Sequence, residues 1–265
     1  MAKHFTLLFT LALMVMIALR VWLAARQMAH VRRHRDAVPA QFAGRVSLSS
    51  HQKAADYCVA RTRFGFVSLA VEVALLLGLT FGGGLQALHQ FWSVQLDGLS
   101  YGVALIFSVM AISSLVDLPL SLYTQFVIEE KFGFNRMTLG LFALDLLKQT
   151  LLGLAIGTPV LLAVLWLMAE MGDPWWFYVW LFWSGFNLLI LFVYPTWIAP
   201  LFNKFTPLED AELKARIEAL LERCGFAASG LFVMDGSKRS AHGNAYFTGF
   251  GKSKRIVFFD TLLSR

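Results

Sequence analysis

Several ionisable side chains lie within or beside strongly apolar stretches of the sequence. Glu72 lies inside the apolar run 64–81, and Asp117, Asp145 and Lys148 lie in or near later runs. A charged side chain at the centre of a bilayer costs about 3 kcal/mol on insertion scales, so such a group favours a polar cavity or a partner. Asp145 and Lys148 are three residues apart and can also pair with each other on a helix. Glu72 has no such neighbour, which leaves a polar cavity, another span or a shallower position.

A second candidate for chemistry is the polar stretch 235–243, which changes abruptly into the strand-like sequence Asn244-Ala245-Tyr246-Phe247. At the edge of a sheet, the free amide and carbonyl groups of such a strand can bind an extended peptide by strand addition. The alternative is an ordinary loop that leads into a hairpin. His242, just before this strand, has no second histidine or cysteine nearby, so a metal-binding role is not favoured.

Recognised catalytic motifs are missing from the 265 residues. The sequence contains no H-E-x-x-H, no G-x-G-x-x-G, no Walker loop and no G-x-S-x-G element. Its two cysteines, Cys58 and Cys224, cannot form a disulfide framework and have no neighbouring metal ligands, so we expect two inert thiols. The individual residues therefore indicate no catalytic centre by themselves.

The composition defines the elements that must position these side chains. Hydrophobic residues make up 57% of the chain and charged residues only 15%, and the mean hydropathy is +0.61. Soluble domains carry about 25% charged residues, so the composition disfavours a soluble domain and excludes a disordered chain. Crossing a bilayer takes about 20 apolar residues. The runs that approach or exceed this length predict five spans, at 5–25, 64–81, 101–122, 139–168 and 175–198.

Lysine and arginine residues predict the orientation of these spans. The connection 26–63 holds eight of them, whereas the connection 82–100 and the turn 170–174 hold none. The positive-inside rule then places the N-terminus outside and the C-terminal part in the cytoplasm. A cleaved signal peptide is the competing interpretation of the first run, since Lys3 precedes it and Ala24-Ala25 follows it. The heavy positive charge after the run favours an uncleaved span.

The sequence after Ile198 predicts a small α+β segment. Thr206, Pro207 and Glu209 have the spacing of a capping box and predict the start of a helix that ends near Gly225. The run 231–234 and the segments 245–250 and 255–262, separated by 251–254, predict a short strand and a hairpin. The predicted fold class is a mainly α polytopic membrane protein, with a membrane domain over 1–202 and a cytoplasmic helix plus β-hairpin over 203–265.

Three blocks occur in a distinctive order along the chain. They are SLY at 121–123 with FVIEEKFGFN at 126–135, then IAPLFNKFTPL at 198–208, and finally VMDGSKRS at 233–240 with NAYF at 244–247 and FFDTLL at 258–263. Together they resemble the type I CAAX prenyl protease family of integral-membrane zinc metalloendopeptidases. The resemblance implies helices around a water-filled chamber with a zinc site at its cytoplasmic end. By its charge the connection 127–135 can be a solvated cytoplasmic loop, but its aromatic and glycine residues suggest an ordered, packed turn.

The family resemblance assigns roles to individual residues. It implies that Asn244, Ala245 and Tyr246 form a strand that hydrogen-bonds the substrate backbone, and that the chamber is lined by Glu72, Asp117, Asp145 and Lys148. In the family, zinc is held by an H-E-x-x-H helix that follows the strand matching 255–263, and this sequence stops at residue 265. We therefore expect the N-terminal part of the enzyme, with no catalytic residue and no zinc ligand in this chain.

The expected function is zinc-dependent peptide hydrolysis in the full-length protein only. The expected partners are the lipid bilayer and a hydrophobic or lipid-modified peptide, with no nucleic acid, and a bacterial inner membrane is favoured over the endoplasmic reticulum. The main alternative is a catalytically inactive scaffold or peptide-binding module derived from the same family. An unrelated transporter or channel is a further alternative, but the chain lacks the repeat symmetry of common transporters.

Overall fold

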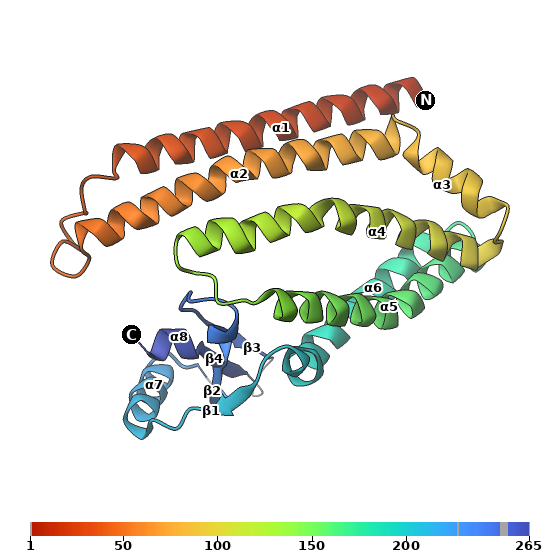
Figure 1. Cartoon of the computed structure of the whole chain (residues 1–265). Helices are drawn as coiled ribbons and strands as arrows, with labels where there is room; N and C mark the ends of the chain where they lie inside the picture. Colours follow the sequence, from red (N-terminus) through yellow and green to blue (C-terminus); the bar gives the residue numbers. More distant parts are fainter. Residues whose placement is uncertain (1, 227, 250–253, 265) are drawn as a thin grey trace. The chain divides into compact units, whose positions relative to one another are not determined.

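The structure is a computed structural model that describes residues 2–226, 228–249 and 254–264 (Figure 1). Five of its helices are long and apolar enough to cross a membrane. They are α1 (Ala2–Arg33), α2 (Leu48–Thr80), α4 (Gly98–Tyr123), α5 (Leu139–Glu170) and α6 (Trp175–Val193), with α6 continuing into the π-helix η2 (Tyr194–Ile198). The predicted number of long apolar helices is thus confirmed, but α1 ends at Arg33 instead of residue 25, and α2 begins at Leu48 instead of residue 64.

Local signals explain where these helices begin and end. The Ser47 hydroxyl accepts the Ser50 N–H at the start of α2, and the Thr138 hydroxyl accepts the Leu141 N–H at the start of α5. Gly83 has a positive φ of 78° directly after the turn that ends α2. The connection that follows contains a helix that the sequence analysis did not predict, α3 (Gly84–Ser93).

The chain divides into two compact units, of which the first comprises residues 1–94 and 107–132. In this unit α1 and α2 lie side by side (Figure 1). The π-helix η1 (Thr124–Glu129) ends it, and there the Tyr57 hydroxyl donates to Glu129 Oε1 over 2.5 Å. The Tyr57 ring also packs edge-on against Phe132. This confirms that the turn after residue 127 is ordered and packed.

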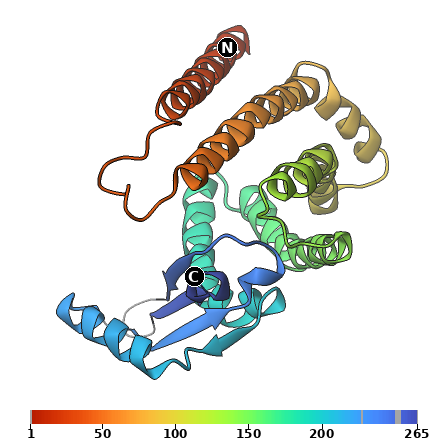
Figure 2. The same ribbon diagram turned by 60° about the vertical axis from the view of Figure 1, so that its left-hand side comes forward.

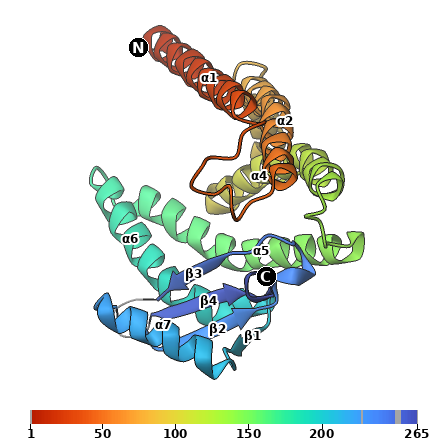
Figure 3. The same cartoon turned by 90° about the vertical axis from the view of Figure 1, so that its left-hand side faces the viewer.

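The second unit comprises residues 95–106 and 133–265 and contains a four-stranded sheet. Figure 3 shows the strands side by side in the order β1, β2, β4, β3. Their bounds are β1 (Phe205–Pro207), β2 (Gly230–Met234), β4 (Arg255–Phe259) and β3 (Ala245–Thr248). The pair β2–β4 is parallel, and the outer pairs are antiparallel. The predicted hairpin exists as β3 and β4, although residues 250–253 of its predicted strand end and turn lie outside the described part of the chain.

Two predictions in this segment are wrong. Thr206 and Pro207 do not start a helix but belong to β1, because they pair with β2. The helix α7 (Ala211–Arg223) starts later, after Asp210, whose carboxylate accepts the Leu213 N–H over 2.9 Å. The second hairpin strand also ends earlier than predicted, at Phe259, and residues 260–263 form the single helical turn α8 (Asp260–Leu263).

The register of the sheet defines two faces. Directly paired residues share a face and alternate along each strand. One face carries Phe205, Phe232, Tyr246, Thr248, Arg255 and Val257, and we call it the α6 face because the end of α6 covers it. The opposite face carries Phe247, whose ring packs edge-on against Phe226 just after α7. Figure 2 shows α7 on this other side of the strands. Val257, on the α6 face, is only 2% exposed, so the middle of the sheet is buried.

Candidate substrate-binding edge and its polar anchor

Strand β3 forms one edge of the sheet and pairs on one side only. Phe259 donates its N–H to the Asn244 carbonyl over 2.9 Å, and Tyr246 lies opposite Val257. In an antiparallel ladder the residues between such hydrogen-bonded pairs direct their N–H and C=O groups away from the partner strand. Ala245 and Phe247 therefore direct their backbone groups toward the open side, where no other described strand lies.

One of these outward groups is already covered by a side chain. Asn244 Oδ1 accepts the Ala245 N–H over 2.9 Å. Among the described residues, the Ala245 carbonyl and both backbone groups of Phe247 have no hydrogen-bond partner, and the Phe247 side chain is 67% exposed. A peptide that adds to this edge finds two acceptors and one donor free, and gains the second donor by displacing the Asn244 oxygen.

Tyr246 points from the same strand to the α6 face. Its hydroxyl lies 4.0 Å from Met234 Sδ, and its ring packs edge-on against Phe259. Burial, and secondarily the nearby Tyr194, raises the pKa of Tyr246 above its ordinary value. The phenol is therefore neutral at physiological pH and adds a hydroxyl but no charge to this face.

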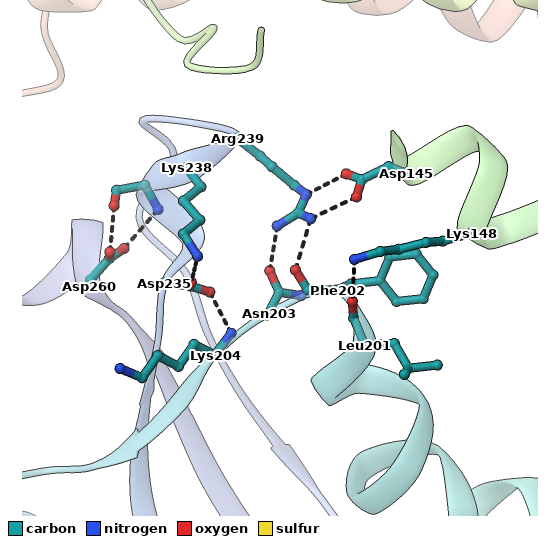
Figure 4. Close-up of polar contacts among 11 residues, drawn as sticks. Asp145, Lys148, Leu201, Phe202, Asn203, Lys204, Asp235, Lys238, Arg239 and Asp260 are labelled. Carbon is teal, nitrogen blue, oxygen red and sulfur yellow. Dashed lines mark hydrogen bonds and ion pairs between the residues drawn. The ribbon is translucent and has the colours of Figure 1, made fainter. Parts of the chain in front are cut away.

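The loop that leads into β3 is held by Arg239 (Figure 4). The guanidinium forms a two-point ion pair with Asp145 of α5, with Nε and Nη2 at 2.7 and 2.9 Å from the carboxylate oxygens. It also donates to Asn203 Oδ1 and to the Phe202 carbonyl, each over 2.8 Å. We call Asp145, Phe202, Asn203 and Arg239 the polar anchor. Because its hydrogen bonds to Asp145 raise the pKa of Arg239, this cation stays charged at any pH at which the protein is folded.

Further polar contacts surround the anchor in Figure 4. Lys148 Nζ donates to the Leu201 carbonyl over 2.8 Å. Asp235 Oδ1 accepts the Lys204 N–H over 2.8 Å, and its other oxygen pairs with Lys238. The Lys148 contact joins α5 to the segment before β1, and the Lys204 contact joins that segment to the loop that follows β2.

Backbone hydrogen bonds also hold the loop that leads into β3. Arg136 donates its N–H to the Arg239 carbonyl over 3.1 Å, and Ala241 donates to the Phe134 carbonyl over 2.9 Å. The His242 ring stacks on the Phe134 ring with centroids 4.1 Å apart. Side-chain and backbone contacts together position the chain just before Asn244, so the edge strand begins at a defined place.

Comparison with known proteins identifies the fold that carries this edge. Residues 27–204 match the family described as CAAX prenyl protease N-terminal, five membrane helices, and residues 207–265 match peptidase family M48. The chain belongs to the CAAX prenyl protease family. The edge strand β3 lies in the M48 part of the chain, and α2, α4, α5 and α6 lie in the N-terminal part.

Individual relatives support this membership. The chain is 37% identical over 250 residues to a CAAX prenyl protease 1 homolog of Caenorhabditis elegans. The matched region covers 93% of this chain and 56% of the worm protein. It is 39% identical to the homolog of Homo sapiens, over 85% of this chain and 49% of the human protein. The crystal structure of S. mikatae Ste24p superposes with a TM-score of 0.84 at 34% identity, covering 95% of this chain and 60% of that chain. The chain thus spans about half the length of the curated relatives it matches.

The four residues predicted to line a chamber have other contacts in the structure. Glu72 pairs with Arg20 of α1 over 3.2 Å, and both side chains are more than half exposed. The Ser121 hydroxyl, one turn along α4, donates to the Asp117 carboxylate over 3.0 Å. Asp145 does not pair with Lys148, as one interpretation allowed, because Arg239 takes both carboxylate oxygens. Their position at the wall of a CAAX prenyl protease chamber stays a prediction.

The metal chemistry of the M48 family can be compared with the donors present. Among residues 2–226, 228–249 and 254–264, no group of three or more histidine, cysteine, aspartate or glutamate side chains is placed to hold a metal ion. The described residues therefore do not form a zinc site by themselves. Cys58, which is partly buried, and Cys224, which is exposed, are both free thiols.

The sequence analysis missed the most connected residue of this region. Arg239 lay inside the polar stretch 235–243 but was not singled out, and its partner Asp145 is 94 positions away. Asn203 was also missed. A usable signal was present, since an arginine in a strand-entry loop and an aspartate within an apolar helix are complementary charges that both need a partner.

Proposed function

We propose that this chain forms the N-terminal part of a membrane zinc metalloendopeptidase of the CAAX prenyl protease type. In this proposal the chain provides the membrane helices and an edge strand, β3, that binds the backbone of the substrate. The observation that carries this proposal is the open edge of β3 within the M48 part of the chain. Peptide hydrolysis is proposed for the full-length protein only, because this chain spans about half the length of its curated relatives.

The strand holds the substrate in an extended conformation. The Phe247 N–H and C=O and the Ala245 C=O pair with the peptide, which becomes a fifth strand of the sheet. Asn244 releases the Ala245 N–H and hydrogen-bonds the peptide through its side-chain amide. Holding a peptide extended exposes its carbonyl groups at fixed positions, which is what a hydrolase needs of its substrate-binding part.

The expected partners and orientation belong to the same proposal. The substrate is a peptide with a hydrophobic or lipid-modified C-terminus, in line with the names of the relatives. The N-terminus lies outside and the sheet lies in the cytoplasm, as the lysine and arginine distribution predicts. The relatives named above are eukaryotic, so they lend no support to a bacterial inner membrane, which stays a prediction.

A binding experiment tests the proposal on the chain as it exists. The chain is reconstituted in lipid nanodiscs, and a fluorescent peptide with an apolar C-terminal sequence is titrated by anisotropy. Asn244→Ala removes about one net hydrogen bond, worth about 1 kcal/mol, so we expect about fivefold weaker binding. The matched control is Asn187→Ala on α6, whose amide donates to the Trp183 carbonyl, and we expect its affinity to equal the wild type.

The outcomes separate two parts of the proposal. If no peptide binds to the wild-type chain, β3 is not a substrate-binding strand and the proposal is wrong. If the peptide binds but Asn244→Ala binds equally or more tightly, Asn244 only covers the Ala245 amide, and its role toward the substrate is excluded.

A further inference from the structure

A cavity of about 200 Å³ lies between the α6 face of the sheet and the end of α6. Its wall on the sheet side includes Phe232, Tyr246, Thr248 and Arg255, and its wall on the other side includes Tyr194 and Thr196 of η2. All of these residues belong to the second compact unit. The cavity therefore adjoins the same strand whose outer edge is open.

The register of the sheet connects this cavity to the open edge. In a β-ladder, directly opposite residues place their side chains on the same face. A peptide residue that lies opposite Tyr246 on the outer side of β3 therefore places its side chain on the α6 face. Tyr246 and Thr248 both belong to β3 and both line the cavity, so that side chain arrives at the cavity mouth.

The size of the cavity limits what can fill it. An apolar cavity of about 150 Å³ binds benzene, and pockets that hold a whole drug-sized ligand measure about 300–1,000 Å³. A cavity of about 200 Å³ thus suits one large side chain of a longer peptide, such as leucine, methionine or phenylalanine.

The charge of the cavity wall further limits which side chains can bind in the cavity. The Arg255 guanidinium carbon lies 5.4 Å above the centre of the Phe232 ring, and Arg255 forms no ion pair with a carboxylate of the described residues. An unneutralised cation in the wall repels a lysine or arginine side chain of the ligand.

We propose that this cavity is a specificity pocket for a single large, uncharged apolar side chain of a peptide added to β3, and that Arg255 excludes cationic side chains from it. The inference rests on the proposed function of β3 as the substrate-binding strand. It extends that function from the backbone of the peptide to the chemistry of one side chain.

The first test uses the wild-type chain in nanodiscs and a peptide series. Each position of an extended peptide is replaced in turn by alanine, leucine, methionine or lysine, and the dissociation constants are measured by anisotropy. Because a pocket that loses even one methylene contact discriminates about tenfold or more, we expect one position at which leucine and methionine bind about tenfold or more tightly than alanine. At that position, lysine binds more weakly than methionine, which has a similar length.

The second test fills the pocket. Thr248→Phe places a ring at the cavity wall, and we expect it to abolish the preference for leucine over alanine while peptides with alanine still bind. The matched control is Thr206→Phe, at an exposed threonine on the other edge strand, whose side chain lies on the opposite face. This control should keep the full preference. Arg255→Gln should raise the affinity for the lysine peptide toward that of methionine.

The outcomes distinguish a failure of the specificity pocket from a failure of peptide binding by β3. If peptides bind but every position tolerates alanine and lysine equally, the pocket is not a specificity site and the inference is overturned, while the proposed function of β3 stands. If no peptide binds to the wild-type chain, strand addition fails and the inference fails with it. The wild-type series decides the matter even if Thr248→Phe does not fold.

Discussion

The two edges of the four-stranded sheet differ in the groups that they present to the outside. On β1, Leu208 donates to the Leu231 carbonyl and Thr206 lies opposite Val233, so the outward position between them is Pro207, which has no N–H. On β3 the outward positions are Ala245 and Phe247, and neither is a proline. The β1 edge lacks an amide donor at Pro207, its last residue, whereas the outward positions of β3 both have one.

This difference indicates which edge of the sheet can bind an added peptide strand. Exposed sheet edges invite unwanted pairing, and proteins protect them with proline, charge or short length. The β1 edge has all three, since it is three residues long, contains Pro207 and follows Lys204. The β3 edge is also short, at four residues, but it contains no proline. One of its amides is covered by the side-chain oxygen of Asn244, a cover that a ligand can displace. An unprotected edge beside a firmly held loop is what strand addition requires.

The polar anchor links the two edges at their start. Arg239 precedes β3 and hydrogen-bonds Phe202 and Asn203, which precede β1, while its ion pair reaches Asp145 on α5. The side chains of Arg239 and Asp145 are 20% and 9% exposed. A well-buried pair of this kind is expensive to break, because the remaining charge loses its partner.

The largest predicted effect is the loss of this anchor. Arg239→Ala leaves the Asp145 carboxylate buried without its cation, and we expect a loss of about 3 kcal/mol in the free energy of unfolding. The loop before β3 should lose order first. Thermal unfolding in detergent measures the loss of global stability, and amide hydrogen exchange across residues 236–248 measures the loss of order in the loop.

The control for this prediction is Arg239→Lys, which keeps the charge but cannot form the two-point ion pair. We expect a smaller loss than for alanine. If Arg239→Ala unfolds at the wild-type temperature with unchanged exchange in this loop, the anchor does not position β3.

The second prediction closes the open edge. Phe247→Pro removes the outward N–H of β3 without removing a hydrogen bond to β4, and the ring obstructs an added strand. We expect peptide affinity in nanodiscs to fall about tenfold. Phe247→Ala is the matched control, since it also loses the contact with Phe226 but keeps the N–H. Equal affinities of the alanine and proline variants would show that the edge donor is not used.

The smallest predicted effect concerns the tyrosine behind the edge. Burial raises the pKa of Tyr246 in the folded state, so above about pH 10 the unfolded chain binds fewer protons at this residue than the folded one. The stability that the neutral phenol contributes is therefore present below pH 10 and is lost as the pH rises further. We expect the wild type to lose stability more steeply than Tyr246→Phe in this range, as measured by thermal unfolding, and parallel curves would contradict this.

The sequence predicted elements that depend on local pattern and missed those that depend on distant pairing. The five spans were predictable because a run of about 20 apolar residues matches the thickness of the bilayer's hydrocarbon core. The helix start at Thr206 was wrong because a capping-box spacing competes with strand pairing, and pairing with β2, about 27 residues later, decides it. The polar anchor joins residues 94 positions apart, and neither periodicity nor spacing encodes such a contact. The candidate strand at Asn244 was predicted from its own residues and supported by the family resemblance, but the sequence could not tell which edge of the sheet was open.

Hydrogen exchange at the two edges tests the central claim most directly. The chain in nanodiscs is exchanged with and without a saturating apolar peptide, and protection is followed at single amides. The account predicts that the peptide slows exchange of the Phe247 amide and leaves the Phe205 amide on β1 unchanged. Protection at β1, or no protection at Phe247 when the peptide is bound, would contradict it.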